Sequence, residues 1–325
     1  MSKFLITGGS GFIGTHIVQS LLSSGEDVLN LDSKKPKVAS HNKYWKNVDI
    51  CNAIELDNAV KAFSPEFVIH LAARTDLNGK LIDDYKANIQ GVTNLLDTLD
   101  RLPSLLQVIF ASSMYVCEPG YVPLDFEDYA PHTVYGESKV LTEKIIKERN
   151  PKYVWSIIRP TSIWGPYFGE PYDLFFKIVL SKRYFHMGAK ACKKTYGYID
   201  NFVAQTLTLL RSESSKVHKS VFYLGDYEPY DISEWADEIA QNQKIRIPKI
   251  PFFVFKLAGL VGDSLKLVGI KFPMTSFRLK NMTTDNIHDL SPIKVLMPNL
   301  PVTRQAGTMK TVEWIQGNTA NVNKN

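Results

Sequence analysis

The sequence TGGSGFIG at residues 7–14 connects a short apolar run, residues 4–7, to a helical pattern over residues 12–22. Its glycines allow a sharp backbone turn and the close approach of a ligand. The helix that follows directs free N–H groups and the positive end of its dipole toward a bound anion. This context predicts a dinucleotide-binding loop rather than a tight turn without a ligand. The loop residues expected to contact the dinucleotide are Gly8, Gly11, Phe12, Ile13 and Gly14.

The rest of the first half repeats this alternation of apolar runs and helical patterns, which is typical of βαβ units. Expected strands cover residues 4–7, 28–31, 67–71, 108–111, 154–158 and 221–224, and expected helices cover 12–22, 85–102, 137–149 and 309–316. The sequence therefore predicts an α/β protein with a Rossmann-type, doubly wound parallel sheet. We expect a nucleotide-binding domain at 1–165 and a flexible tail at 319–325. Between them, residues 166–318 should form mainly a smaller C-terminal substrate-binding domain, with segments that return to the first domain.

The composition is that of an ordinary globular protein: 325 residues, 44% of them hydrophobic and 22% charged, with a net charge of +5. The basic residues are scattered and accompany no nucleic-acid-binding motif, so we expect no nucleic-acid partner. Three cysteines without a CxxC pair favour a reducing cytoplasm and no metal site. Because the N-terminus runs straight into Lys3 and the first expected strand, we expect no signal peptide.

Residues 251–272 form the most apolar stretch in the second half of the chain. Lys256, Asp263 and Lys266 interrupt this stretch, which is too short between charges to span a bilayer. We expect it to be a helix on the body of the protein, and we expect no membrane partner. A role at a membrane surface is the alternative.

An acidic residue, Asp32, ends the second expected strand about 20 residues after the glycine loop. A carboxylate at this place accepts hydrogen bonds from the adenosine ribose and repels the 2′-phosphate of NADP. Lys34 and Lys35 follow and would reduce that repulsion if they lay near the phosphate. The alternative is that they belong to an exposed basic loop without contact to the cofactor. The pattern favours NAD over NADP, with Asp32 and Ser33 as expected contacts.

Several short motifs occur together in one order along the chain. They are TGGSGFIG at 7–14, DI at 49–50, HLAA at 70–73, SS at 112–113, YGESK at 135–139 and RPT at 159–161. This ordered set resembles the extended short-chain dehydrogenase/reductase family, also called NAD-dependent epimerase/dehydratases. The resemblance runs from the N-terminus to about Pro166.

The resemblance implies a role for each matching residue. Ser113, Tyr135 and Lys139 correspond to the catalytic residues, and Lys139 would also hydrogen-bond the nicotinamide ribose. The further implied cofactor contacts are Asp49, Ile50, Leu71, Ala72, Ala73, Asn88 and Thr161. Arg278 would hold the diphosphate of a nucleotide sugar, unless it is an ordinary surface residue. Family members commonly dimerise through the helices expected here at 85–102 and 137–149, so a homodimer is expected.

Elementary chemistry supports the catalytic part of this interpretation. Tyr135 and Lys139 are four residues apart, so their side chains share one face of a helix. A tyrosine with a pKa of about 10 is a poor base at neutral pH, and a nearby ammonium group lowers that pKa. Ser113, at the end of a strand, would hold the substrate oxygen. These groups suit the removal of a hydroxyl proton during hydride transfer.

The residues after Ser113 help to separate the possible reactions. Sugar-nucleotide 4,6-dehydratases of the family carry an Asp-Glu pair there, whereas this chain has Met114 and Tyr115. The leading hypothesis is an NAD-dependent sugar-nucleotide epimerase, acting at C4 with Tyr135 as acid and base. A reductase or dehydrogenase of a keto sugar or of a hydroxysteroid-like alcohol is the alternative. A dinucleotide-sensing regulator without catalysis is a third, non-enzymatic possibility.

Overall fold

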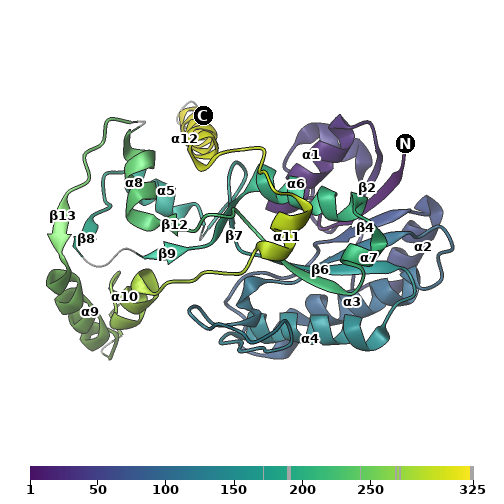
Figure 1. The fold of residues 1–325 in the computed structure, drawn as a ribbon, viewed down its shortest axis with the longest axis horizontal. Helices are drawn as coiled ribbons and strands as arrows, with labels where there is room; N and C mark the ends of the chain where they lie inside the picture. Colours follow the sequence, from purple (N-terminus) through teal and green to yellow (C-terminus); the bar gives the residue numbers. More distant parts are fainter. Residues whose placement is uncertain (171, 189–191, 242, 268, 271, 323–325) are drawn as a thin grey trace.

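A computed structural model describes the whole chain except residues 171, 189–191, 242, 268, 271 and 323–325. One end of the elongated molecule holds a seven-stranded, all-parallel sheet in the order β11-β6-β5-β4-β1-β2-β3 (Figure 1). Its strands are β1 Lys3–Thr7, β2 Asp27–Asp32, β3 Trp45–Asn47, β4 Phe67–His70, β5 Gln107–Ala111, β6 Val154–Pro160 and β11 Ser220–Leu224. This is the doubly wound, Rossmann-type sheet that the sequence predicts.

Helices cover both faces of the sheet, because its strands are apolar on both sides. Alternate residues of β1 show this directly: Leu5 packs into one buried cluster, and Phe4 and Ile6 pack into the other. One face is covered by α1 Phe12–Ser23 and α6 Ile199–Arg211, with α7 Ser214–Val217 and α11 Ser291–Leu296 nearby, and the other by α2 Ala53–Phe63, α3 Lys86–Leu99 and α4 Val134–Arg149. All six predicted strands are present, whereas β3, α2, α6, α7 and α11 were not predicted.

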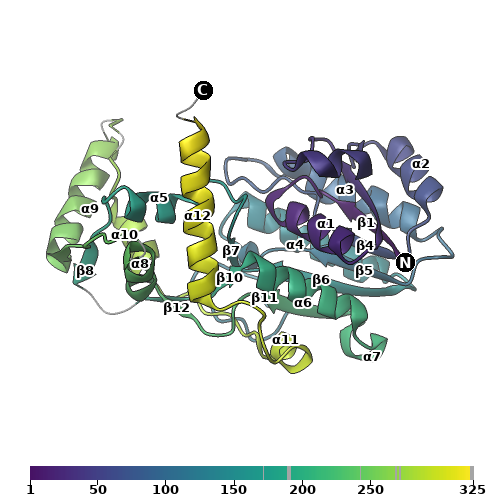
Figure 2. The same ribbon diagram turned by 90° about the horizontal axis from the view of Figure 1, so that it is seen from above.

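The other end of the molecule is a second lobe built from the rest of the chain (Figure 2). It contains α5 Leu174–Leu180, α8 Ile232–Gln241, α9 Phe252–Leu267, α10 Ser276–Thr283 and α12 Arg304–Val322. Its short strands are β8 His186–Gly188, β9 Lys193–Lys194, β12 Tyr230–Asp231 and β13 Lys249–Pro251, while β7 Ser162–Trp164 pairs with β10 Tyr196–Tyr198 near the sheet.

Aromatic side chains form the core of the second lobe. The rings of Trp164 and Trp235 lie 4.9 Å apart, and the indole N–H of Trp235 donates to Thr308 Oγ1 at 3.1 Å. Thr308 belongs to α12, and the neighbouring Gly307 lies so close to the Tyr198 ring that a Cβ there would be 2.7 Å from it. The helix expected at 309–316 is longer than predicted, because its first turn completes this core. It also continues through most of the segment predicted to be a flexible tail, whose last three residues lie outside the described part.

The apolar stretch at 251–272 differs from the prediction. Its helix α9 packs against α10, β13 and β8 rather than against the main body of the protein (Figures 1 and 2). Its only buried residues are Gly259 and Gly262. Within the described part of the chain, no helix is long and apolar enough to cross a membrane.

Candidate active site

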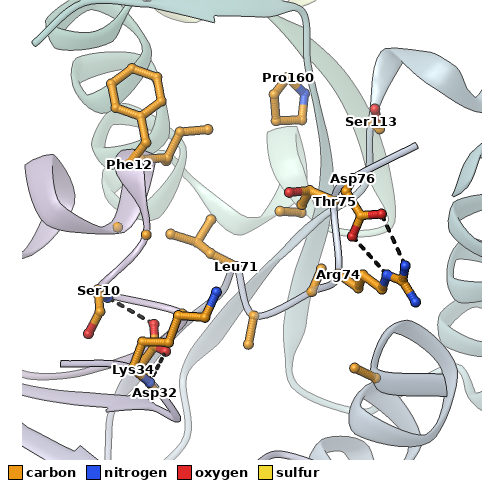
Figure 3. A pocket seen from close by; sticks show the side chains of 18 of the residues that line it. Ser10, Phe12, Asp32, Lys34, Leu71, Arg74, Thr75, Asp76, Ser113 and Pro160 are labelled. Atoms are coloured by element: carbon orange, nitrogen blue, oxygen red, sulfur yellow. Dashed lines mark hydrogen bonds and ion pairs between the residues drawn. The ribbon is translucent and has the colours of Figure 1, made fainter. Parts of the chain in front are cut away.

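An elongated cavity of about 820 Å³ lies at the carboxyl ends of the central strands. In Figure 3, Asp32 and Ser113 lie at opposite ends of this cavity with Leu71 between them. Its lining includes all the predicted site residues except two: Gly8, Gly11, Phe12, Ile13, Gly14, Asp32, Ser33, Asp49, Ile50, Leu71, Ala72, Ala73, Ser113, Tyr135, Lys139 and Thr161. The cavity therefore joins the glycine loop to the predicted catalytic residues.

The glycine loop is packed so closely that side chains would not fit. Gly8 has a left-handed φ of 75°, and a Cβ there would lie 2.6 Å from the backbone nitrogen of Ala72. A Cβ on Gly14 would overlap the carbonyl oxygen of Gly8. Gly11 caps α1 without a side-chain hydrogen bond, so the first amides of the helix face the cavity. The loop fits a pyrophosphate at the helix N-terminus.

The carboxylate of Asp32 is fixed at the other side of this loop. It accepts hydrogen bonds from the Ser10 amide at 3.0 Å and from the Lys34 amide at 2.8 Å (Figure 3). Lys34 lines the cavity, whereas Lys35 is exposed and does not. A fixed negative charge at this point fits ribose hydroxyls and opposes a phosphate group.

Asn88 does not line the cavity but lies buried behind it. Its side-chain oxygen accepts from the Arg74 amide at 2.8 Å, and its amide group donates to Ser138 Oγ at 2.9 Å. Asn88 thereby connects the loop after β4 to α4, the helix that carries Tyr135 and Lys139.

The three predicted catalytic side chains meet at the Ser113 end of the cavity. Thr133 caps α4 by accepting the Gly136 amide at 3.0 Å, which places Tyr135 in the first turn and Lys139 one turn later. All three side chains are buried, with exposed fractions of 4–7%. The Lys139 ammonium donates to the carbonyl of Ala111 at 2.8 Å, at the end of β5.

A family model described as the NAD dependent epimerase/dehydratase family matches residues 4–225. The chain belongs to this family. The family description names NAD, which confirms the predicted cofactor, and the cavity geometry fits it. The resemblance inferred from the ordered motifs is likewise confirmed.

Relatives within the epimerase/dehydratase family have different activities. A 3-beta-hydroxysteroid dehydrogenase from Mycolicibacterium neoaurum is 25% identical over 77% of this chain and 72% of its own length. A UDP-glucuronate 4-epimerase from Thermodesulfobacterium geofontis is 25% identical over 98% of this chain and 97% of its own. The crystal structure of UDP-glucose 4-epimerase from Thermotoga maritima, with UDP-glucose, has a TM-score of 0.75 at 21% identity and covers 98% and 99% of the two chains. That last similarity establishes the fold alone.

The pKa values in this epimerase/dehydratase site differ from the expectation that a nearby ammonium group lowers the pKa of Tyr135. Burial raises the pKa of Tyr135 to about 12, although a hydrogen bond with Ser113 opposes this rise. The expectation that the Tyr135 pKa is lowered is wrong for this structure, because the cost of burying a phenolate dominates. Burial also lowers the pKa of Lys139 to about 8, against the raising effect of the Glu143 carboxylate.

Several side chains of the wall were not predicted, and two of them are tyrosines near the catalytic end. Tyr115 and Tyr172 line the cavity, and the Tyr115 ring lies 6.0 Å from that of Tyr135. Sequence reasoning considered Tyr115 only for its lack of a carboxylate, and no motif marks Tyr172. Conversely, Arg278 does not line the cavity: it lies on α10 and donates to the carbonyl of Pro273 at 2.9 Å.

Proposed function

We propose that this protein is an NAD-dependent sugar-nucleotide epimerase that acts at C4 of the sugar. The observation that carries the proposal is the meeting of Ser113, Tyr135 and Lys139 in the same cavity as the glycine loop. A hydroxyl-bearing carbon at this end would have a hydrogen-bond donor, a proton carrier and a cation around it. The full-length relationship to a UDP-glucuronate 4-epimerase supports this choice of substrate class.

The proposed roles follow from the chemistry of the three groups. When bound, NAD⁺ supplies a hydride acceptor and a positive nicotinamide ring. Tyr135 receives the proton of the sugar hydroxyl and later returns it, while Ser113 holds the sugar oxygen by a hydrogen bond. Lys139 keeps positive charge beside the reacting groups, which favours the phenolate form of Tyr135. The sugar turns over between the two transfers, so no NAD is consumed overall.

A dehydrogenase or reductase of a hydroxysteroid-like alcohol is the second candidate. Two observations favour it: the relationship to a 3-beta-hydroxysteroid dehydrogenase over 77% of the chain, and the position of Arg278 outside the cavity. Because Arg278 lies outside the cavity, it is not placed to bind the diphosphate of a nucleotide sugar there. Met114, Ile163 and Tyr172 at the cavity wall suit an apolar substrate equally well.

A 4,6-dehydratase activity is not part of the proposal, although the family includes dehydratases. Elimination of water needs an acid and a base next to the reacting sugar carbons. Met114 and Tyr115, which follow Ser113 at the cavity wall, bring no carboxylate there.

We further propose that the protein is a cytoplasmic homodimer, joined through α3 and α4. A monomeric mass by light scattering at micromolar concentration would contradict the dimer.

A panel of nucleotide sugars and hydroxysteroids, offered with NAD, tests the proposal. The reduced-nicotinamide absorbance and the product, identified by NMR, are followed together. An isomerised sugar without net NADH supports the epimerase, whereas stoichiometric NADH with a hydroxysteroid supports the second candidate. A 4-keto-6-deoxy product would contradict the exclusion of dehydratase activity. The Tyr135→Phe variant should lose the activity, and Tyr121→Phe, on an exposed loop, should keep it.

A further inference from the structure

The helix α9 presents its large apolar side chains to solvent and its glycines to the protein. Gly259 and Gly262 face the segment before α10, where a Cβ on Gly262 would overlap the carbonyl of Met274. On the opposite side, six large apolar residues are 39–89% exposed: Phe253, Val254, Leu257, Leu260, Val261 and Leu267. At 100° per residue they occupy an arc of roughly 140° of the helix surface. An ordinary surface helix instead turns its apolar side chains toward the protein core and its polar side chains toward solvent.

Three more large apolar side chains are exposed close to α9. Ile270 is 53% exposed after the end of α9, Phe272 is 38% exposed beside Gly262, and Phe277 is 69% exposed in the first turn of α10. We call these nine residues the apolar surface of the second lobe. A group of exposed apolar side chains of this extent marks an interaction surface, whereas single ones do not. The surface lies at the end of the molecule away from the sheet (Figures 1 and 2).

Positive charge is concentrated in the part of the chain that carries the apolar surface. Residues 244–280 contain eight Lys or Arg residues and one Asp, a net charge of +7 in a chain whose total is +5. The described cations of this segment are all exposed: Lys244, Arg246, Lys249, Lys256, Lys266, Arg278 and Lys280. Among the described residues, none of them forms a salt bridge, and Asp263 accepts the Ser276 amide instead.

We propose that the apolar surface of the second lobe, carried mainly by α9, binds the surface of an anionic lipid bilayer. A helix with exposed Phe and Leu beside exposed Lys and Arg inserts its apolar side between lipid head groups, and its cations meet the lipid phosphates. The helix lies in the interface and does not span it. A second copy of the chain is a poorer partner, because a two-fold contact would set a charge of +7 against the same charge. This proposal does not depend on the substrate and departs from the sequence-based expectation of no membrane partner.

Co-sedimentation of the full-length protein with vesicles tests the proposal. With equal parts of phosphatidylcholine and phosphatidylglycerol, we expect the protein in the pellet, and with phosphatidylcholine alone we expect it in the supernatant. Salt at about 0.5 M should weaken binding to the anionic vesicles, because it screens the cations. Failure to sediment with anionic vesicles at low salt overturns the proposal.

Two variants assign any binding to the apolar surface and its cations. F253S/L257S/L260S should reduce binding at least about tenfold, since each substitution removes apolar area that enters the lipid. K256E/K266E should reduce binding to anionic vesicles by roughly tenfold. V122S/L124S is the matched control, because these side chains are 82% and 95% exposed on another loop, and it should bind like the original protein. Equal binding by the control and the triple variant overturns the proposal.

The same variants distinguish a lipid surface from a second copy. All substituted side chains are exposed, so thermal unfolding and solution activity should stay unchanged. Light scattering without lipid should give the same mass for the triple variant and the original protein. A lower mass for the triple variant would overturn the proposal in favour of contact between copies of this chain.

Discussion

Arg159 and Glu143 form a bidentate ion pair that is fully buried between β6 and α4. The guanidinium donates through Nε and Nη2 to the two carboxylate oxygens, at 2.9 Å in each case, and neither side chain is exposed. Tyr129 also donates to Glu143, at 2.9 Å, and the Arg159 group lies over the Tyr129 and Tyr223 rings. Glu143 is one helical turn from Lys139, so the pair connects the core to the catalytic helix.

Replacing Glu143 with Gln should destabilise the protein by roughly 3 kcal/mol, because the buried guanidinium loses its counter-charge. Urea unfolding measures the change. Glu127→Gln is the control, since Glu127 pairs with Lys147 on the surface with 74% of its side chain exposed. That substitution should cost less than about 1 kcal/mol. Similar values for both variants would contradict the prediction.

The same substitution should alter the pH dependence of the reaction. The Glu143 carboxylate raises the pKa of Lys139, which burial lowers to about 8. Without that charge the Lys139 pKa falls further, so the ammonium form is lost at a lower pH. The alkaline limb of the kcat/KM profile should therefore move to lower pH in Glu143→Gln. An unshifted limb in a folded variant would show that Lys139 does not set it.

Asp32 should control the choice between NAD and NADP. Asp32→Asn keeps the shape of the side chain but removes the charge that opposes a 2′-phosphate. The ratio of kcat/KM with NAD to that with NADP should fall by roughly tenfold or more. Asp27→Asn, at the other end of β2, is the control and should leave the ratio unchanged. A ratio that is the same in Asp32→Asn would remove the role assigned to this carboxylate.

Gly14→Ala should damage the cofactor loop, because the added Cβ would overlap the Gly8 carbonyl. We expect a lower unfolding temperature and weaker binding of NAD, measured by calorimetry. Gly317→Ala makes the same substitution in α12, where nothing lies within 4 Å of the added atom. Since alanine favours a helix by about 1 kcal/mol over glycine, that variant should be at least as stable as the original. Normal NAD affinity in Gly14→Ala would contradict the structure of the loop.

The buried carboxyl of Asp226 should make stability depend on pH. Burial raises its pKa to about 6, although Tyr230, Asn201 and the Tyr198 amide donate to it. The folded state therefore binds this proton more tightly than the unfolded state, and the protein loses stability as the pH rises from about 4 to 6. Asp226→Asn removes this loss and should gain roughly 2–3 kcal/mol at pH 7. Unfolding curves at pH 4 and 7 measure it, and an equal pH response in both proteins would contradict the prediction.

Most of the first lobe could be predicted from the sequence, because parallel strands buried on both faces are continuous apolar runs. β3 was missed because it lacks such an apolar run: its three residues lie at the sheet edge, and two of them are exposed. In α2, only Leu56, Ala59 and Val60 are buried, so its apolar pattern is short and weak. A helix or strand produces a recognisable apolar pattern in the sequence only when enough of its side chains are buried.

The site was predictable where one short segment carries several groups, as in the glycine loop or the pair Tyr135 and Lys139. The position of Arg278 was not, since it depends on how the second lobe packs. Nor was the raised pKa of Tyr135, because the degree of burial comes from elements far along the chain. The exposure of the apolar side chains of α9 was not predicted, because the sequence shows which residues are apolar but not whether another part of the protein covers them.

The position of α12 has a consequence for how the protein is made. All seven strands of the sheet have been synthesised once Leu224 is added, so the first lobe can assemble early. The aromatic core around Trp164 and Trp235 is completed by α12, through Gly307, Thr308 and the buried Val312. This half therefore stays open on the ribosome until almost the whole chain has emerged, and a nascent chain halted before residue 307 would present uncovered tryptophans to chaperones.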